Sequence, residues 1–587
     1  MFSFNFYHQI VIFALFHVIS TQELNVYISA SSSCSSCDGT LPNPFPDLNS
    51  AINSSYSQLQ SQSNLSHINF QFLGLNYTIP PSSTAKQYFY QWEQILVRNL
   101  SISISPQGCA TSCPFNFILY LKTQNISFFA VSEFIISYMI IECGDSSLSS
   151  SLISMNCFTN GLCCCYNNFS NISDSCYIGN LSVSRSETDR SLFEIWSFTN
   201  FTFNNIIIQN LFSVNKITYY SYAIRLKTIK SNISIINSEF NYIYLRDALL
   251  KISVSSNILI QNSTFLYYNA FNFIENVTTQ TYSFVISADT YVVNLSCVNS
   301  AFSNIQFVAF LYISNSSFQN CIFYVKIRTT TLSTNTGMTG FLLFGPSVNT
   351  SIVNCSFFQG DLQTNLKGVN KLGLIYLSTY SNIQIVDCNF SNLSLRDARI
   401  FYSLSYSQIM FLNDYFTSID HTCYDFPSSN CLYYLFDSYT YNNFTFSNSS
   451  LNNITILADN NLFRIYSTNN VTFINVTLEN IQLINGGSNY MINFYSGNTL
   501  IFQNMMVTNY SVGYSAGFFN FDNRNLVIFL GSIFIANNPD IIASGQIINI
   551  NTLNVIYVNY TTFGNMCATY RNNFYILSFN NITVYRS

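Results

Sequence analysis

The stretches SNISIINSEF (Ser231–Phe240) and SNILIQNSTF (Ser256–Phe265) share a pattern that returns in SNIQIVDCNF (Ser381–Phe390) and NNVTFINVTL (Asn469–Leu478). In each copy an Asn is followed by alternating apolar and polar residues, and a second Asn or Asp comes five residues after the first. Alternation with a period of two is typical of β-strands that bury one face. The copies therefore predict a chain built from repeated short strands.

The second Asn or Asp of each copy recurs at an average spacing of about 29 residues. Helical repeats, leucine-rich repeats and propeller blades differ from this pattern in composition or length. The best match is an all-β solenoid, a single-stranded right-handed parallel β-helix, in which successive coils stack about 4.8 Å apart. We expect the recurring residues to lie buried at equivalent corners, with their amides hydrogen-bonded along the stack. The predicted ladder is Asn205, Asn237, Asn262, Asn299, Asn354, Asp387, Asn448, Asn475, Asn504 and Asn559.

The composition sets limits on the class of protein. The 587 residues are 48% hydrophobic and only 8% charged, with 21 Lys and Arg against 26 Asp and Glu. So much apolar material excludes an intrinsically disordered chain. A net charge of −5, without a basic stripe, argues against a nucleic-acid binder.

The N-terminus indicates the secretory pathway. The apolar run Ile10–Ile19 is short for a membrane span but suits the core of a signal peptide covering residues 1–20. The alternative is a buried N-terminal strand. Asn-x-Ser/Thr acceptors occur roughly two dozen times, which fits an exported glycoprotein. We expect an extracellular or cell-surface location, with membrane attachment only through regions outside this sequence.

The 17 cysteines agree with that compartment, because disulfides persist outside the cytosol. The probable disulfide residues are Cys34 and Cys37, Cys109 and Cys113, and Cys423 and Cys431. Cys355 and Cys388 each follow a ladder residue, and we interpret them as small core residues, with a disulfide between them as the minor alternative. The cysteine-rich segment at about 142–190 interrupts the repeat and is expected to be a loop insertion.

One further motif links the chain to a known family. The segment CDGTLPNPFPDLNSAI (Cys37–Ile52) contains Asn43, Pro44 and Phe45 followed by a Leu and an Ala-Ile pair. It resembles the N-terminal segment of the pectin-lyase-like right-handed β-helix superfamily, in the form found in large secreted or surface proteins of protists such as ciliates. The resemblance implies an N-terminal cap over 21–66, with a short helix near 47–60, and a β-helix over 67–587.

The fold also occurs in polysaccharide lyases and hydrolases, and such an enzyme would need a cluster of catalytic carboxylates. A strand precedes each copy of the repeat, and its outward position shows no cluster of carboxylates that could bind a hard cation. We therefore interpret this column as a solvated or partly aromatic sheet face. Its residues are Glu194, Lys251, Leu343, Tyr376, Phe401, Asp437, Arg464 and Asn493. The densest titratable group is Asp414, Asp420, His421 and Asp425, which we interpret as a loop beside Cys423 rather than a catalytic site. No regular column of exposed Tyr is expected.

These observations favour a non-enzymatic extracellular or cell-surface protein that acts as a rigid scaffold or recognition module. We expect no catalytic residue, metal or cofactor. The sequence does not identify the protein or glycan partner. A carbohydrate-active enzyme of the same fold and a glycan-binding adhesin are the alternatives. Because the repeat continues to the end of the sequence, with Ile582 and Val584 in a further strand, we expect a fragment of a cell-surface protein; a complete secreted protein is the alternative.

Overall fold

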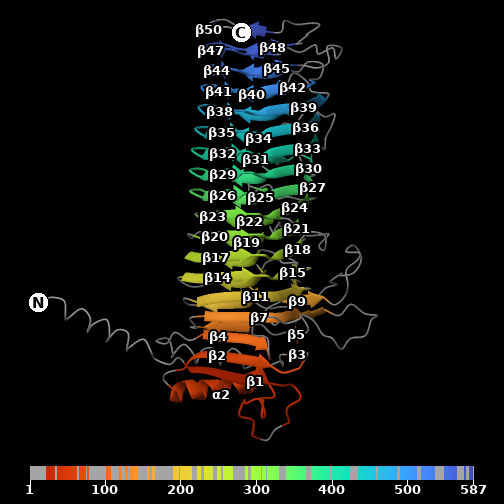
Figure 1. Cartoon of the computed structure of the whole chain (residues 1–587), viewed down its shortest axis with the longest axis vertical. Helices are drawn as coiled ribbons and strands as arrows, with labels where there is room; N and C mark the ends of the chain where they lie inside the picture. The colour runs from red at the N-terminus through yellow and green to blue at the C-terminus, as the bar shows by residue number, and fades with distance from the viewer. Residues whose placement is uncertain are drawn as a thin grey trace, which may run out of the picture.

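The computed structural model is a tall stack of short strands, with the N-terminal strands at the bottom and the C-terminal strands at the top (Figure 1). It describes residues 22–33, 36–62, 65–74, 76–78, 101–107, 118–120, 126–129, 133–142, 155–157, 162–165, 190–196, 199–209, 211–213, 221–226, 230–241, 248–252, 255–268, 284–288, 293–305, 307–311, 314–329, 339–364, 372–396, 398–422, 434–457, 461–484, 490–511, 517–535, 548–564, 574–576 and 581–585.

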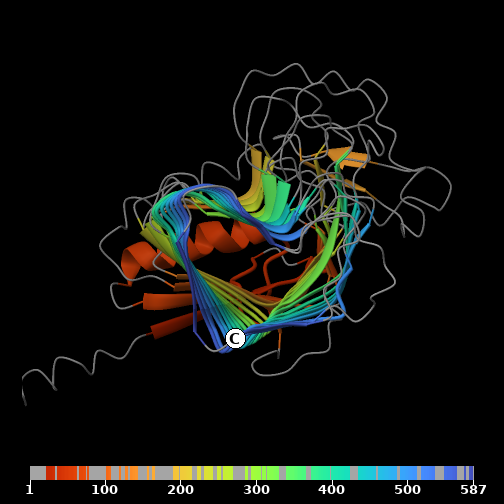
Figure 2. The same cartoon turned by 90° about the horizontal axis from the view of Figure 1, so that it is seen from above.

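Successive coils contribute strands to three faces (Figure 2), and the apolar side chains between the faces form one buried cluster. We number the faces in chain order. The first face contains β1(Gln22–Ile28), β2(Leu65–Phe72), β4(Ser101–Pro106), β7(Glu133–Glu142), β11(Thr199–Gln209), β14(Lys230–Ile236), β17(Ser255–Gln261), β20(Val293–Val298), β23(Ser314–Gln319), β26(Asn349–Val353), β29(Asn382–Val386), β32(Gln408–Leu412), β35(Asn443–Ser447), β38(Asn470–Ile474), β41(Thr499–Gln503), β44(Leu526–Leu530), β47(Val555–Asn559) and β50(Asn581–Tyr585).

The second face follows the first around a sharp corner, and the long strands β7 and β11 contribute to both. Its other strands are β3(Asn76–Thr78), β5(Ile118–Tyr120), β15(Glu239–Asn241), β18(Thr264–Tyr268), β21(Ala301–Ile305), β24(Ile322–Thr329), β27(Ser356–Thr364), β30(Asn389–Arg396), β33(Tyr415–Thr422), β36(Ser450–Leu457), β39(Thr477–Ile484), β42(Met506–Thr508), β45(Ile533–Ile535) and β48(Thr562–Gly564).

The third face closes the coil before the chain returns to the first face. Its strands are β6(Ile126–Phe129), β10(Arg190–Trp196), β13(Ser221–Leu226), β16(Ala248–Ile252), β19(Phe284–Ala288), β22(Phe307–Leu311), β25(Thr339–Phe344), β28(Leu372–Leu377), β31(Arg399–Ser403), β34(Tyr434–Ser438), β37(Asn461–Ile465), β40(Tyr490–Phe494), β43(Gly517–Phe521), β46(Ile548–Ile550) and β49(Phe574–Ile576).

Every pairing along these faces is parallel, which confirms the prediction of an all-β parallel solenoid. The register puts like residues above one another, as with Asn349 and Asn382. The number of residues between stacked positions varies widely: it is 21 between Asn294 and Asn315, 37 between Asn257 and Asn294, and 67 between Phe134 and Phe201. The strands therefore keep their register while the connecting segments differ in length.

The lower end carries the motif with Phe45. This residue is buried, and its backbone N–H donates to Tyr27 O (2.9 Å) at the first strand, β1. A Cβ at Gly39 would collide with the Phe45 ring, and Gly39 also has φ +78°, so the turn requires glycine. The segment 21–66 thus adds a strand to the first face as well as the helix.

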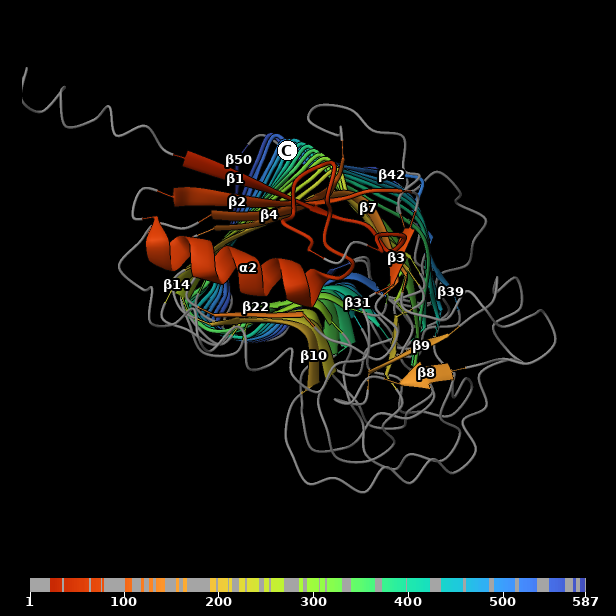
Figure 3. The ribbon, with the colours of Figure 1, turned by 90° about the horizontal axis from the view of Figure 1, so that it is seen from below.

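The helix α2(Leu48–Ser61) lies across the bottom of the stack, as Figure 3 shows from below. The Asp47 side chain caps it by accepting the Ser50 N–H at 2.8 Å. Its buried side includes Ala51 and Ile52, which belong to the same apolar cluster as the strands. No helix in the described part of the chain is long and apolar enough to cross a membrane.

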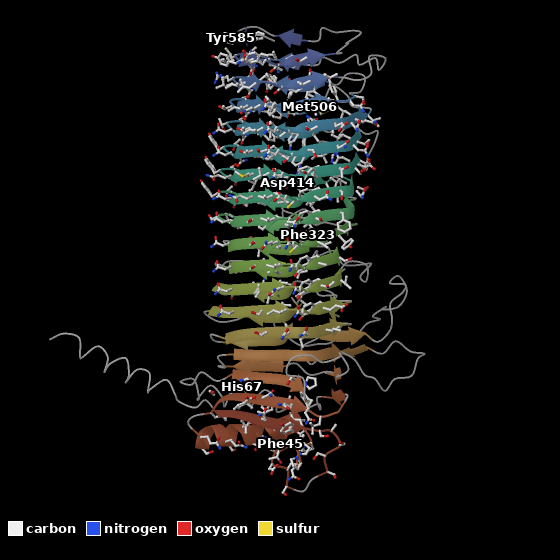
Figure 4. All side chains as sticks on the ribbon, viewed as in Figure 1. Phe45, His67, Phe323, Asp414, Met506 and Tyr585 are labelled. Carbon is white, nitrogen blue, oxygen red and sulfur yellow. The ribbon has the colours of Figure 1, made fainter. Side chains whose placement is uncertain are left out.

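Columns of like side chains fill the interior. On the second face the rings of Phe240, Phe265, Phe302, Phe323, Phe357, Phe390 and Phe416 stack in succession, with centroids 4.5–5.2 Å apart. In Figure 4, Phe323 lies midway up the stack, between Phe45 near the bottom and Tyr585 near the top. Such columns repeat the same contact from coil to coil.

Two regions differ from the repeat. Of the predicted insertion at about 142–190, the structure describes the end of β7, the start of β10 and two strands between them, β8(Met155–Cys157) and β9(Leu162–Cys165). With β12(Leu211–Ser213) these two form an antiparallel sheet. At the other end β50 pairs with β47, and Ile582 and Val584 are exposed.

Candidate functional site

An open groove of about 720 Å³ runs up the outer surface of the first face. It crosses the strands β14, β17, β20, β23, β26, β29 and β32, so it follows the solenoid axis over seven coils. Among the described residues that line the groove, none is charged. Its outward-facing lining residues include Asn232, Ser234, Asn257, Leu259, Asn294, Ser296, Asn315, Ser317, Asn349, Ser351, Asn382, Gln384 and Gln408.

The Asn residues of the groove form a hydrogen-bonded column, which we call the outer Asn column. Each side-chain amide donates through Nδ2 to Oδ1 of the Asn one coil below. The N–O distances are 2.8 Å for Asn257–Asn232 and Asn294–Asn257, 3.3 Å for Asn315–Asn294 and Asn349–Asn315, and 3.0 Å for Asn382–Asn349. An Asn amide has two N–H donors and two oxygen lone pairs. Asn257, Asn294, Asn315 and Asn349 each use one donor and one acceptor site in the column, which leaves one of each for a ligand.

The predicted ladder residues occupy a second column, the corner Asn column, between the first and second faces. Asn262 donates to Asn237 (3.1 Å) and Asn475 to Asn448 (2.9 Å), and the same bond recurs in neighbouring coils. The expectation that these residues are buried is wrong, because Asn237, Asn262, Asn354 and Asn475 are exposed. Each has a left-handed backbone (φ 50°, 49°, 51° and 53°), which turns the side chain outward and brings the next residue inward. Asn is one of the few non-glycine residues that tolerates this conformation.

The other predicted ladder members are placed as follows. Asn205, Asn299, Asp387, Asn448 and Asn504 all have positive φ at this corner. Asn559 is displaced by one residue: it pairs with Leu530 on β44, and the left-handed corner is at Tyr560. Asn320 and Asn413 also belong to the column, by hydrogen bonds to Asn299 and Asp387. Asn320 could have been identified, because it follows Asn315 by the usual five residues.

A third column faces the interior and was not predicted. In the upper coils Asn442, Asn469, Asn498, Asn525 and Asn554 stand one residue before the first face, and all are buried. Each Oδ1 accepts the backbone N–H of the preceding coil, as in Asn442 N to Asn469 Oδ1 (2.8 Å) and Asn469 N to Asn498 Oδ1 (2.9 Å). We call this the inner Asn column. It satisfies backbone groups that the turn leaves without a strand partner.

An exposed tyrosine stack lies beside the groove, so the expectation of no regular Tyr column is wrong. Tyr380, Tyr406 and Tyr441 occupy the turn before the first face in three successive coils, with exposed fractions of 63%, 50% and 53%. Their ring centroids are 5.0 and 4.9 Å apart, and the rings are nearly parallel. All three have positive φ (57°, 58° and 60°), which is unusual for a bulky residue and strains the backbone.

The stack adjoins the groove in two coils. Tyr380 precedes Asn382 by two residues and Tyr406 precedes Gln408 by two, and both partners line the groove. Because each ring covers the face of the next, the stack presents ring edges and phenol hydroxyls to solvent. The unequal loop lengths hide this column in the sequence, and it emerges only from the register.

The outward column of the third face differs from the expectation in two ways. Its residue in β31 is Tyr402, which pairs with Tyr376 and Asp437, so Phe401 was misplaced by one. From Leu343 to Arg464 the column is also buried rather than solvated, at 1% exposure for Tyr376 and 0% for Asp437, whereas Lys251 and Asn493 are half-buried. Burial raises the pKa of the Tyr376 and Tyr402 phenols, so both stay neutral.

A buried ion cluster occupies that column. Arg464 donates to both oxygens of Asp437 (2.9 and 2.6 Å), and Arg399 Nε lies 3.1 Å from Asp437 Oδ2. The Arg464 guanidinium also lies 3.5 Å from the Tyr434 ring centroid. A single carboxylate held between two guanidiniums is poorly suited to proton transfer and well suited to holding adjacent coils together.

The predicted titratable cluster is dispersed. Asp414 points inward at the corner between the first two faces, whereas Asp420 is exposed on the second face. His421 is buried, with Nε2 2.9 Å from Ala398 O, and burial lowers its pKa to about 4. Burial raises the pKa of Asp414 to about 9, and its Oδ1 accepts the Cys388 N–H at 2.7 Å. Asp425 lies outside the described residues.

The remaining candidate residues are metal ligands and cysteines. Within the described residues no group of three His, Cys, Asp or Glu side chains could hold a metal ion. Cys37 is disulfide-bonded, while Cys34, Cys109, Cys113, Cys423 and Cys431 lie outside the described residues. Cys355 and Cys388 are free and buried in one column. Of the outward column, the side chain of Glu194 also lies outside the described part of the chain.

Comparisons with known proteins give fold likenesses alone. No protein-family model matches the chain, and no curated protein matches it. Among solved structures, the chain is similar to the crystal structure of a GH136 lacto-N-biosidase from Eubacterium ramulus, with 7% identity and a TM-score of 0.24, covering 96% of this chain and 68% of that one. It is also similar to the PL6 family alginate lyase AlyGC, with 8% identity and a TM-score of 0.19, covering 96% and 99%. At this level neither structure carries an argument about activity.

Proposed function

We propose that this chain is an extracellular recognition scaffold that binds an extended, uncharged polysaccharide along the groove of the first face. In this proposal residues 1–20 are a signal peptide, and the chain is a right-handed β-helix of the pectin-lyase-like type, capped at its lower end by α2. The strand connections support the handedness, because parallel crossovers are almost always right-handed.

The observation that carries the proposal is the outer Asn column in its groove. From Asn257 to Asn349 the column offers one spare amide donor and one spare acceptor per coil, about every 4.8 Å, within a groove that is roughly 29 Å long. That repeat is close to the length of one monosaccharide in an extended chain. Ser side chains beside the column, such as Ser296 and Ser317, add hydroxyls at the same spacing.

The chemistry of the lining favours a neutral ligand. Recognition of acidic polymers relies on Arg and Lys, and none of the groove residues is charged. Sugar hydroxyls both donate and accept hydrogen bonds, as amides do. The tyrosine stack adds phenol hydroxyls along one side, and tyrosine combines a polar tip with apolar ring edges.

The proposal of a non-enzymatic role rests on the placement of the carboxylates. Glycoside hydrolysis requires two carboxyl groups that flank one bond. Among the described residues near the middle of the stack, Asp414 points inward, Asp420 is exposed on the second face and Asp437 is buried at the third. None of them lines the groove.

The experiment that tests the proposal measures glycan binding to residues 21–587 by calorimetry. The probes are hexasaccharides of cellulose, mannan and chitin, with polygalacturonate and heparin as the acidic contrast. We expect at least one neutral hexasaccharide to bind, and the double variant Asn294→Leu/Asn315→Leu to weaken it at least tenfold. Asn443→Leu is the matched control, because Asn443 belongs to the same outward position above the groove.

Two outcomes would contradict the proposal. One is binding to the acidic polymers alone, or to none of the probes. The other is an equal loss of affinity in the double variant and in Asn443→Leu, which would place the ligand elsewhere. Release of reducing sugar from the bound oligosaccharide would instead support the enzymatic alternative.

A further inference from the structure

Four buried free thiols lie together in the wall between the first and second faces: Cys297, Cys321, Cys355 and Cys388. Three of them directly follow a residue of the corner Asn column, which is Asn320, Asn354 or Asp387, and they stack in successive coils. The Cys321 N–H donates to Cys355 Sγ (3.3 Å), and the Cys355 N–H donates to Cys388 Sγ (3.4 Å). Cys297 is the exception, because it lies inside strand β20 of the coil below Cys321.

The sulfur of Cys297 faces that of Cys321 directly. The Sγ–Sγ distance is 3.5 Å, and Cys321 Sγ also lies 3.4 Å from Cys297 O. In the next two coils the thiol at the corner faces a backbone carbonyl of the coil below and no second sulfur. Cys355 Sγ lies 3.5 Å from Phe318 O, and Cys388 Sγ lies 3.5 Å from Ile352 O. The strand register shows why: the position of Cys297 is taken by Phe318 one coil higher and by Ile352 above that.

We propose that Cys297 and Cys321 form a disulfide between adjacent coils when the chain folds under oxidising conditions. The two thiols lose two protons and two electrons to a small disulfide such as oxidised glutathione, which is reduced to two thiols, and one S–S bond forms. The sulfurs must approach from 3.5 Å to about 2.05 Å, a shift that side-chain rotation and small backbone adjustment supply.

The burial of Cys297 and Cys321 determines at which stage of folding the disulfide can form. Both residues are shielded from solvent, at 0% and 1% exposure, and burial raises the pKa of the Cys297 thiol. Because the thiolate is the reactive species, exchange with an external oxidant is slow once the coils have closed. The bond therefore forms during folding.

The test is a cysteine map of the full chain secreted from eukaryotic cells. The protein is denatured in iodoacetamide without reduction, digested and analysed by mass spectrometry. We expect a linked peptide pair containing Cys297 and Cys321, 2 Da lighter than the two free peptides, with Cys355 and Cys388 alkylated. Complete alkylation of both Cys297 and Cys321, or a link from Cys321 to Cys355, would overturn the proposal.

Two variants separate the bond from general misfolding. Cys297→Ile places at this position the same residue type as Ile260, which pairs with Cys297 from the coil below, so the packing of the core column is kept. In this variant we expect Cys321 to be fully alkylated. Cys355→Ser leaves the link intact. A second measurement compares the rate of disulfide formation in two samples of reduced chain. The first sample is refolded in the presence of oxidised glutathione, and the second is folded before oxidised glutathione is added. We expect at least a tenfold faster linkage in the first sample; equal rates would contradict the formation of the bond during folding.

Discussion

The lower and upper coils use the same amide side chain on opposite sides of one wall. In the lower coils Asn257 and Asn294 face outward and line the groove, whereas in the upper coils Asn498 and Asn525 face inward. There the outward position has passed to Thr499 and to the apolar residues Leu526 and Val555. The two positions are one residue apart in the sequence. At the outward position the Asn amide keeps hydrogen-bonding capacity for a ligand, and at the inward position it bonds to backbone groups.

Inward and outward residues of the wall should differ in the property that they control. Inward residues at the turns should control stability and leave binding unchanged. Outward residues should control binding and leave stability almost unchanged. Adjacent pairs such as Asp414 with Asn413, and Asn469 with Asn470, allow each claim to be examined within one coil.

The largest effect is expected at Asp414, where the inward position carries an acid. Its pKa is about 9 in the folded chain against 3.8 ordinarily, so its contribution to stability is full below pH 3.8 and is lost as the pH rises toward 9. The slope is about 1.4 kcal/mol per pH unit, or on the order of 5 kcal/mol by pH 8. Denaturation of Asp414→Asn between pH 5 and 9 should show a flatter profile and higher stability at pH 8. The exposed Asp420→Asn serves as the control, and parallel pH profiles in wild type and Asp414→Asn would contradict the assignment.

The next effect concerns the inner Asn column. Asn469→Leu removes the acceptor of the buried Asn442 N–H and the donor to the partly buried Tyr466 O, so two backbone groups lose a partner. We expect a loss of about 3 kcal/mol in local stability. Hydrogen exchange around residue 442 measures it, which suits a stack of coils that opens in parts. Asn470→Leu, one residue away and exposed, should change stability by no more than about 0.5 kcal/mol; similar losses in both variants would remove the distinction between the two sides of the wall.

A smaller effect concerns ligand length. If the sugar chain lies along the outer Asn column, affinity should rise with each added monosaccharide and level off at roughly six, the number that spans seven coils. Calorimetry with a series of two to eight units measures this. A plateau at two units would indicate a compact pocket and would contradict binding along the axis.

The smallest effect is expected at the tyrosine stack. Tyr406→Asn introduces a residue that tolerates positive φ, so relief of about 1 kcal/mol of strain offsets the lost ring contacts. Stability should change little, while affinity for the neutral glycan should fall about threefold. Tyr560→Asn, also at positive φ and exposed but far above the groove, is the matched control. Unchanged affinity in Tyr406→Asn would exclude the stack from the binding surface.

The sequence allowed the parallel coils to be predicted because strand alternation and the Asn spacing are local patterns. It placed Asn237 and Asn262 at one corner, but it could not tell which side of the wall they face, since that depends on a left-handed backbone at one residue. The inner column was overlooked because Asn442 and Asn469 directly precede exposed Asn residues. The Tyr380–Tyr406–Tyr441 stack was missed for another reason: its members are brought together by loops of unequal length, which only the three-dimensional register reveals.

The direction of the hydrogen bonds between coils has a mechanical consequence. These bonds run along the solenoid axis, so a pull on the two ends loads all coil boundaries in series, and the weakest boundary opens first. A coil such as that from Asn475 to Asn504, 29 residues long, occupies only one strand spacing in the stack. Once released, it can extend to roughly 95 Å. A surface carrying such a molecule would therefore yield under load in discrete steps whose lengths follow the lengths of the individual coils, while the coils that remain closed keep their groove.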